Sequence, residues 1–182
     1  MKRIKINNEA TISVLIMVSL GHLLNDMFQS VIPAIYPMLK EALGLSFLQV
    51  GIITLINQLT SSLLQPLVGY FSDKHPRPYG LAMGMCFTLG GLVLLSFADS
   101  FALILAAVAM VGIGSSVLHP ESSKVARLAS GGAKGMAQSV FQVGGNVGRA
   151  FGPVVGALMI VPHGQGTIRW LALLSIVAIG LL

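Results

Sequence analysis

Charged side chains are scarce in this sequence. Only 9% of the 182 residues are Asp, Glu, Lys or Arg, whereas 54% are hydrophobic and the mean hydropathy is +0.85. A soluble domain carries about a quarter charged residues, so the composition argues against that class and indicates a membrane protein. The net charge of +5 does not indicate a nucleic-acid partner, because no basic face with interleaved aromatic residues is present.

Several motifs of enzymes and pumps are also missing. The single cysteine, Cys86, cannot form an intrachain disulfide and has no basic neighbour to activate its thiol. No Walker loop is present, which excludes ATP-driven transport within this chain. GIGSS at 112–116 is not the G-x-S-G motif of a membrane-embedded serine protease, and no histidine–carboxylate set has metal-ligand spacing along the chain. We therefore expect no enzyme activity, no cofactor and no metal ion.

What the sequence does contain is a series of six apolar segments at or near membrane-spanning length. They cover residues 12–39, 47–71, 79–98, 101–118, 136–161 and 167–182. The last segment offers about 24 Å of helix against a hydrocarbon core of about 30 Å, so we expect the sixth span to be incomplete at Leu182. The predicted fold class is an all-α membrane protein, a six-helix transmembrane bundle that occupies residues 1–182.

The basic residues predict the orientation of this bundle. With residues 1–11 as a cytoplasmic tail, the cytoplasmic side holds eight of them, Lys2, Arg3, Lys5, Lys74, Arg77, Lys124, Arg127 and Lys134. The opposite side holds only Lys40 and Arg169. The positive-inside rule therefore predicts a cytoplasmic N-terminus.

The stretch GYFSDKHPRP at 69–78 places charge between the second and third spans. Taken alone, it is consistent with a solvated turn. It also resembles the loop between these spans in the major facilitator superfamily, and four positions match that pattern: Gly69, Asp73, Lys74 and Arg77. Pro76 and Pro78 depart from it. The resemblance implies a cytoplasmic gate, in which Asp73 docks at a helix N-terminus of another half of the protein, where the helix dipole favours a carboxylate.

Glycines recur every four residues in the fifth span, at 144, 148, 152 and 156. Small residues at this spacing let a second helix approach closely, which is a general feature of transmembrane packing. Gly148, Gly152, Pro153 and Gly156 also resemble the fifth-span motif of proton-driven drug antiporters in the superfamily, although Ala157 replaces a glycine common there. Pro153 adds a site where the helix can kink.

A narrower resemblance covers nearly the whole chain. Stretches such as SLGHLLNDMFQSVIPAIYPML and GSSVLHPESSKVARLASGG are similar to the fosmidomycin resistance protein group of bacterial antiporters. The resemblance implies export of a small anionic antibiotic, such as fosmidomycin, in exchange for protons across the bacterial inner membrane. It also implies the N-terminal half of a twelve-span fold built of inverted three-span repeats, with a C-terminal six-span half as partner. The alternative is a six-span channel-like or assembly protein that acts as an oligomer.

Ionisable side chains within the spans are candidates for function, because each costs about 2.5–3.5 kcal/mol at mid-membrane. His22 and Asp26 are four residues apart and share one face of the first span. Arg149 lies at a similar depth in the fifth span, so we expect it to pair with Asp26. We interpret Asp26 as a proton-coupling carboxylate; a static ion pair that only orients the helices is the alternative.

Further polar residues complete the set of candidates. His119 and Glu121 flank Pro120 in the fourth span, where a proline break and a titratable imidazole suggest gating or proton relay. A surface ion pair between Glu121 and Lys124 is the simpler interpretation. The residues expected to line a substrate cavity are Asn25, Asn57, Gln58, Gln142 and Asn146, with interhelical hydrogen bonding as the alternative for the second-span members.

Overall fold

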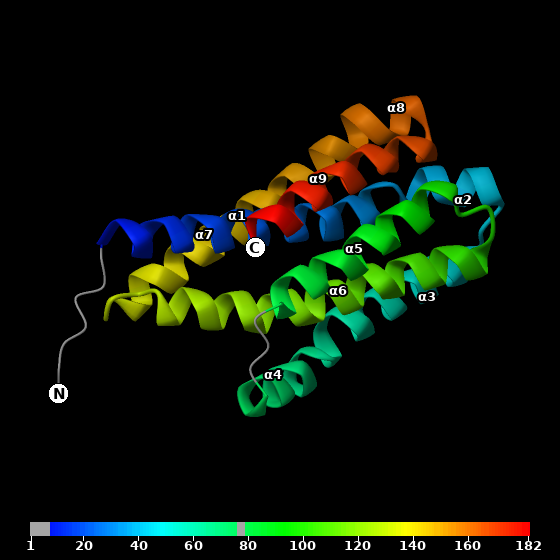
Figure 1. Cartoon of the computed structure of the whole chain (residues 1–182). Coiled ribbons are helices and arrows are strands. Elements are labelled where there is room, and N and C mark those ends of the chain that lie inside the picture. The colour runs from blue at the N-terminus through cyan, green and yellow to red at the C-terminus, as the bar shows by residue number, and fades with distance from the viewer. Residues whose placement is uncertain (1–7, 76–78) are drawn as a thin grey trace.

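The computed structural model describes residues 8–75 and 79–182, in which all regular structure is helical (Figure 1). Within this part of the chain, five helical stretches are long and apolar enough to cross a membrane, and Gln165–Leu181 is a shorter apolar helix. The predicted all-α transmembrane bundle is therefore confirmed. Arg77 of the gate motif, the two flanking prolines and the first seven residues of the predicted tail lie outside the described residues.

The first predicted span consists of two helices. α1 (Asn8–Ala34) begins inside the predicted tail and is followed by α2 (Tyr36–Leu43) after a turn at Ile35. The division arises because Pro37, in the first turn of α2, has no N–H to donate to the carbonyl four residues earlier. A left-handed Gly44, with φ of 61°, ends α2.

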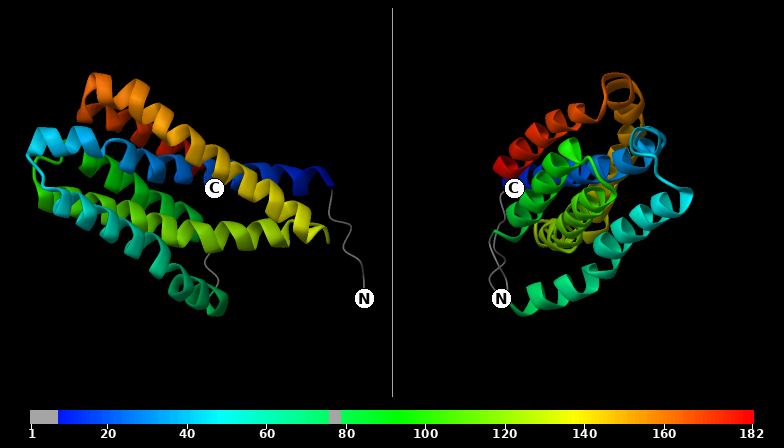
Figure 2. Two further views of the ribbon diagram at one scale, coloured as in Figure 1. Left: turned by 180° about the vertical axis from the view of Figure 1, so that it is seen from behind. Right: turned by 90° about the vertical axis from the view of Figure 1, so that its right-hand side faces the viewer.

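The second span changes its helical geometry midway. α3 (Phe47–Gln58) begins at a capping box, in which the Gln49 N–H donates to Ser46 Oγ at 3.2 Å and the Ser46 N–H donates to Gln49 Oε1 at 2.8 Å. A π-helical turn over Leu59–Leu63 then leads into α4 (Gln65–Lys74), which diverges from the other helices in Figures 1 and 2. Such π turns are frequent at functional sites, and this one lies within the polar part of the span.

The remaining spans alternate in direction across the bundle (Figure 2). Their elements are α5 (Gly80–Phe97), α6 (Phe101–Leu128), α7 (Lys134–Val155) continued by a π turn at Gly156–Ile160 and α8 (Val161–His163), a 3₁₀ turn at Gln165–Thr167 and α9 (Ile168–Leu181). α6 continues ten residues beyond the predicted end of the fourth span at 118 and passes through Pro120. The expectation that Pro120 breaks the helix is therefore wrong.

Glycines bring the helices together in pairs. A methyl group built on Gly148 of α7 would overlap the Leu23 carbonyl of α1, and one on Gly152 would lie 2.7 Å from the Met27 carbonyl oxygen. α5 and α6 make the same kind of contact, since a methyl group on Gly84 would lie 2.9 Å from the Gly114 carbonyl oxygen. The close helix contact expected from the four-residue glycine spacing is present, and it fixes α7 against α1.

Candidate functional site

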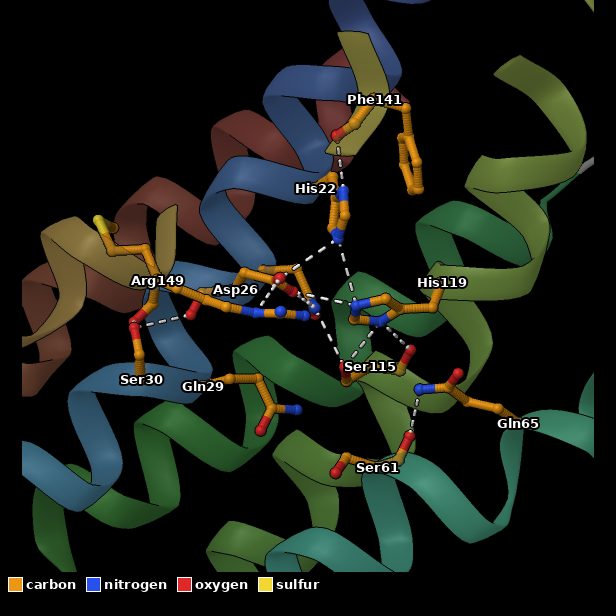
Figure 3. A network of polar contacts seen from close by, with 12 residues as sticks. His22, Asp26, Gln29, Ser30, Ser61, Gln65, Ser115, His119, Phe141 and Arg149 are labelled. Atoms are coloured by element: carbon orange, nitrogen blue, oxygen red, sulfur yellow. Dashed lines mark hydrogen bonds and ion pairs between the residues drawn. The ribbon is translucent and has the colours of Figure 1, made fainter. Parts of the chain in front are cut away.

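Asp26 lies at the centre of a cluster formed by α1, α6 and α7 (Figure 3). Its Oδ2 is 2.9 Å from Arg149 Nε and 3.3 Å from His22 Nε2, and its Oδ1 is 3.1 Å from His119 Nε2. Only 2% of the Asp26 side chain is exposed. The pairing of Asp26 with Arg149 that their similar depths suggested is thus present, and His119 joins them from the fourth span.

The two histidines are held by backbone carbonyls. His22 Nδ1 lies 2.9 Å from the Phe141 carbonyl oxygen, and the two rings are stacked with their centroids 4.0 Å apart. His119 Nδ1 lies 3.0 Å from both the carbonyl oxygen and the hydroxyl of Ser115. These contacts aim both Nε2 atoms at Asp26 and at each other, with 3.3 Å between them.

A second layer of polar contacts supports the carboxylate. Asn25 Nδ2 donates to Asp26 Oδ1 at 3.2 Å and to Ser115 Oγ at 3.1 Å, which links α1 to α6 beneath the cluster. Gly145 covers it from α7, and a methyl group there would overlap the His22 ring and lie 2.9 Å from Asp26 Oδ2. The cluster therefore has a close-fitting cover that only glycine provides.

The cluster opens into a polar cleft of about 310 Å³. Asp26, His119 and Arg149 form one wall, and the second span provides much of the other, with residues Thr54, Asn57, Gln58, Ser61, Ser62 and Gln65. Arg149 reaches into this space, with 61% of its side chain exposed. A guanidinium beside hydroxyl and amide groups suits a small, polar, anionic ligand.

The sequence-based candidates for the cavity divide into two groups. Asn57 and Gln58 line the cleft, whereas Asn25 is fully buried beneath Asp26. Gln142 and Asn146 lie on the exposed face of α7 and are not among the residues that line this cleft, so their assignment to a substrate cavity stays a prediction. Both residues lie on the exposed face of α7, whereas the glycines of the four-residue series lie on the face that packs against α1.

Glu121 does not join the cluster. Its carboxylate accepts a hydrogen bond from Ser72 and lines a largely apolar pocket of about 330 Å³ between α4, α5 and α6. The expected surface ion pair with Lys124 is also not formed, because Lys124 Nζ is 2.9 Å from Asp73 Oδ1 instead. A single residue between His119 and Glu121 places their side chains on different sides of α6.

The described part of the gate motif lies against the end of α6. Asp73, with 71% of its side chain exposed, pairs with Lys124 of this chain and does not depend on a second half for a partner. A methyl group on Gly69 would meet only Pro120 among the described residues, at an ordinary 3.7 Å. Lys74 is exposed and donates to the Tyr70 hydroxyl.

The fold assembles a set of potential metal ligands that the spacing along the chain did not indicate. His22, Asp26 and His119 each offer one ligand atom, and these atoms lie within 4.8 Å of one another. The spacing along the chain did not indicate this set, because His119 is 97 residues from His22 and only helix packing brings them together.

Sequence reasoning also missed the residues that orient the cluster, namely Ser115, Phe141 and Gly145. Phe141 acts through its carbonyl group, which every residue type has, so its identity could not indicate this role. Ser115 stands in GIGSS, where it was considered only as part of a protease motif. Gly145 directly follows Gly144 of the regular glycine series, and this extra glycine is the signal that could have indicated a close contact with the first span.

Comparisons with known proteins agree with this architecture. Residues 18–182 match the model of the Major Facilitator Superfamily. The fosmidomycin resistance protein of Escherichia coli (strain K12) is 59% identical over 162 residues, which are 89% of this chain and 40% of that protein. The uncharacterised MFS-type transporter YfnC of Bacillus subtilis (strain 168) is 45% identical over 166 residues, 91% of this chain and 41% of that protein. The chain thus spans about two fifths of the length of these relatives.

Proposed function

Because the chain belongs to the major facilitator superfamily, we propose that it forms the N-terminal six-span half of a proton-coupled drug exporter. The proposed substrate is a small anionic antibiotic such as fosmidomycin, which the name of the Escherichia coli relative suggests. The protein is a multi-pass membrane protein; we place it in the bacterial inner membrane with a cytoplasmic N-terminus, as its basic residues predict. A C-terminal six-span half would complete the transporter.

The observation that carries this proposal is the contact between Asp26 and Arg149 at the wall of a polar cleft. A carboxylate and a guanidinium that form a pair each lower the free-energy cost of placing the other's charge within the membrane. Arg149 is exposed to the cleft while Asp26 is buried behind it. The arginine is therefore the group that an entering anion meets first, and the carboxylate is the group that is left to take up a proton.

The cycle that we propose alternates between two partners for Arg149. In one state Arg149 is paired with ionised Asp26, as in this structure. In the other state this pair is released, either by the anionic drug on the guanidinium of Arg149 or by a proton on Asp26 or on the adjoining His22 and His119. The drug and the proton do not bind together in this cycle, so the drug crosses in one direction and the proton returns in the other, which is the thermodynamic requirement for antiport.

We further propose that the gate motif holds the cytoplasmic side closed in one state. The exposed Asp73 contacts Lys124 at the end of the same helix that carries His119, so a change at the cluster and a change at the gate involve one rigid element. Gly69, Lys74 and Arg77 would complete this latch, and Glu121, which contacts Ser72 on the neighbouring helix, would belong to it and not to the proton-coupling group.

Replacement of Arg149 by glutamine tests the substrate assignment. In the full-length transporter, we expect Arg149→Gln to raise the KM for fosmidomycin about ten- to a hundredfold, because a hydrogen bond to a charged group contributes about 1.5–3 kcal/mol. Uptake of labelled drug into everted membrane vesicles measures this. Arg169→Gln is the matched control, since Arg169 is exposed at the start of α9 and is not part of the cleft wall. An unchanged KM in Arg149→Gln would show that the drug does not bind this guanidinium.

A further inference from the structure

The hydrogen bonds of the two histidines place electron-rich ring nitrogens beside each other and beside the Asp26 carboxylate. A carbonyl oxygen can only accept, so the ring nitrogen that faces it carries the proton. We therefore assign the proton to Nδ1 of His22, against the Phe141 carbonyl, and to Nδ1 of His119, against the Ser115 carbonyl. In their neutral forms both Nε2 atoms then present bare lone pairs to each other and to a carboxylate.

A cation between the lone pairs would remove this repulsion. The Nε2 atoms are 3.3 Å apart, and they lie 3.3 Å and 3.1 Å from the two oxygens of Asp26. The Arg149 guanidinium approaches Asp26 from the side of the cleft, with its Nε 2.9 Å from Oδ2. A proton can fill the gap by sitting on one Nε2, and a metal ion can fill it by binding both.

We propose that His22, Asp26 and His119 form a binding site for a divalent transition-metal ion, with Zn²⁺ as the best fit. Zinc binds imidazole nitrogen at about 2.0–2.1 Å in tetrahedral geometry, which places neighbouring ligand atoms about 3.3 Å apart. The distance of 3.3 Å between the two Nε2 atoms agrees with this value, and these atoms lie 3.3 Å and 3.1 Å from the two different oxygens of Asp26. The ion would meet the edge of the carboxylate between its two oxygens.

The surroundings of the cluster also fit a metal site. Histidines that bind a metal usually donate their other ring N–H to a carbonyl or carboxylate, which fixes the tautomer, and both histidines here do so. Two imidazoles and one carboxylate favour Zn²⁺ and its neighbours over Mg²⁺ or Ca²⁺, which prefer oxygen ligands. Access is open, because Asp26 and His119 line the cleft and 20% of the His119 side chain is exposed.

Occupation of this site would connect two helices. His22 and Asp26 belong to α1 and His119 belongs to α6, so the ion would cross-link the first and fourth spans. It would also take the position that a coupling proton uses. The metal is therefore expected to hold the transporter in one state and to inhibit it, but its binding does not depend on what the transporter carries.

The test is a Zn²⁺ titration of the purified full-length protein at neutral pH, in detergent and without a polyhistidine tag. We expect saturable binding of one equivalent in a calorimeter. His119→Ala and His22→Gln should each weaken it at least about tenfold, since loss of even an outer-shell partner costs 10–100-fold. Mg²⁺ should not compete. Binding should weaken as the pH falls, because protons compete for the same nitrogens.

The double variant His75→Ala/His163→Ala is the matched control, because both histidines are exposed and lie outside the cluster. It should bind Zn²⁺ as the wild type does. Co²⁺ provides a second readout, since a tetrahedral site gives an intense visible absorption that His119→Ala should lose. Unfolding temperatures without metal identify any variant that fails to fold. Absence of stoichiometric binding to the wild type, or equal binding to His22→Gln and His119→Ala, would overturn the proposal, whatever the drug transport assays show.

Discussion

Replacement of Asp26 by asparagine is expected to abolish drug export driven by a pH gradient, with a loss of at least about a hundredfold in rate. Asparagine keeps the shape of the side chain and much of its hydrogen bonding, but it cannot exchange a proton or neutralise Arg149. The buried side chain contacts Arg149, His22 and His119 in the structure, so no other carboxylate among the described cleft residues can replace it. Export would then lose its coupling while binding of the drug to Arg149 persists.

Two measurements separate this role from a structural one. Exchange of labelled for unlabelled drug in the absence of a pH gradient should survive in Asp26→Asn, because it requires no net proton movement. Asp99→Asn is the matched control, as Asp99 is an exposed residue between α5 and α6, outside the cluster. If Asp26→Asn exports with the rate and pH dependence of the wild type, Asp26 only orients the helices.

Replacement of Gly152 by leucine should separate α7 from α1. A methyl group on Gly152 would already overlap the Ser30 hydroxyl and lie 2.7 Å from the Met27 carbonyl oxygen. Neither the Met27 backbone nor the short Ser30 side chain can make room for the four carbons of a leucine side chain, so the two helices must move apart. Overpacking costs about 1–3 kcal/mol, which corresponds to a fall in unfolding temperature of roughly 2–12 °C. We expect most of the export to be lost, because Arg149 is carried by α7 and Asp26 by α1.

Gly51→Leu provides the control for this change. Gly51 lies within α3, and a methyl group built on it meets nothing within 4 Å in the described residues. The same substitution there should leave the unfolding temperature close to that of the wild type. A Gly152→Leu protein with wild-type stability and export would contradict the helix contact between α1 and α7.

The fold and part of the site could be predicted from the sequence because their signals are local. Apolar length predicted the spans, the glycine spacing predicted one face of α7, and equal depth in parallel spans predicted the contact of Arg149 with Asp26. Helix boundaries were less accurate: α6 extends past 118 because a proline within a helix removes one hydrogen bond without ending the helix, as Pro120 shows.

The remaining part of the site depends on helix rotation, which no local pattern specifies. His119 and Glu121 were treated as one group, but they are two positions apart and about 200° around the helix, so only His119 reaches Asp26. Gln142 and Asn146 share the exposed face of α7 with Arg149, and their assignment to a substrate cavity stays a prediction. The Phe141 carbonyl that orients His22 carries no signal in its side chain.

The most direct test of the proposed exchange of drug for proton at the Asp26–Arg149 pair is a measurement of proton movement that depends on the drug. The full-length transporter is reconstituted into liposomes with an acidic interior and a pH-sensitive dye inside, and fosmidomycin is added outside. The proposed antiport predicts that the drug accelerates the rise in internal pH, that this effect saturates, and that it is absent in Asp26→Asn. Drug uptake into the same liposomes with no drug-dependent change in internal pH would contradict proton coupling at this site.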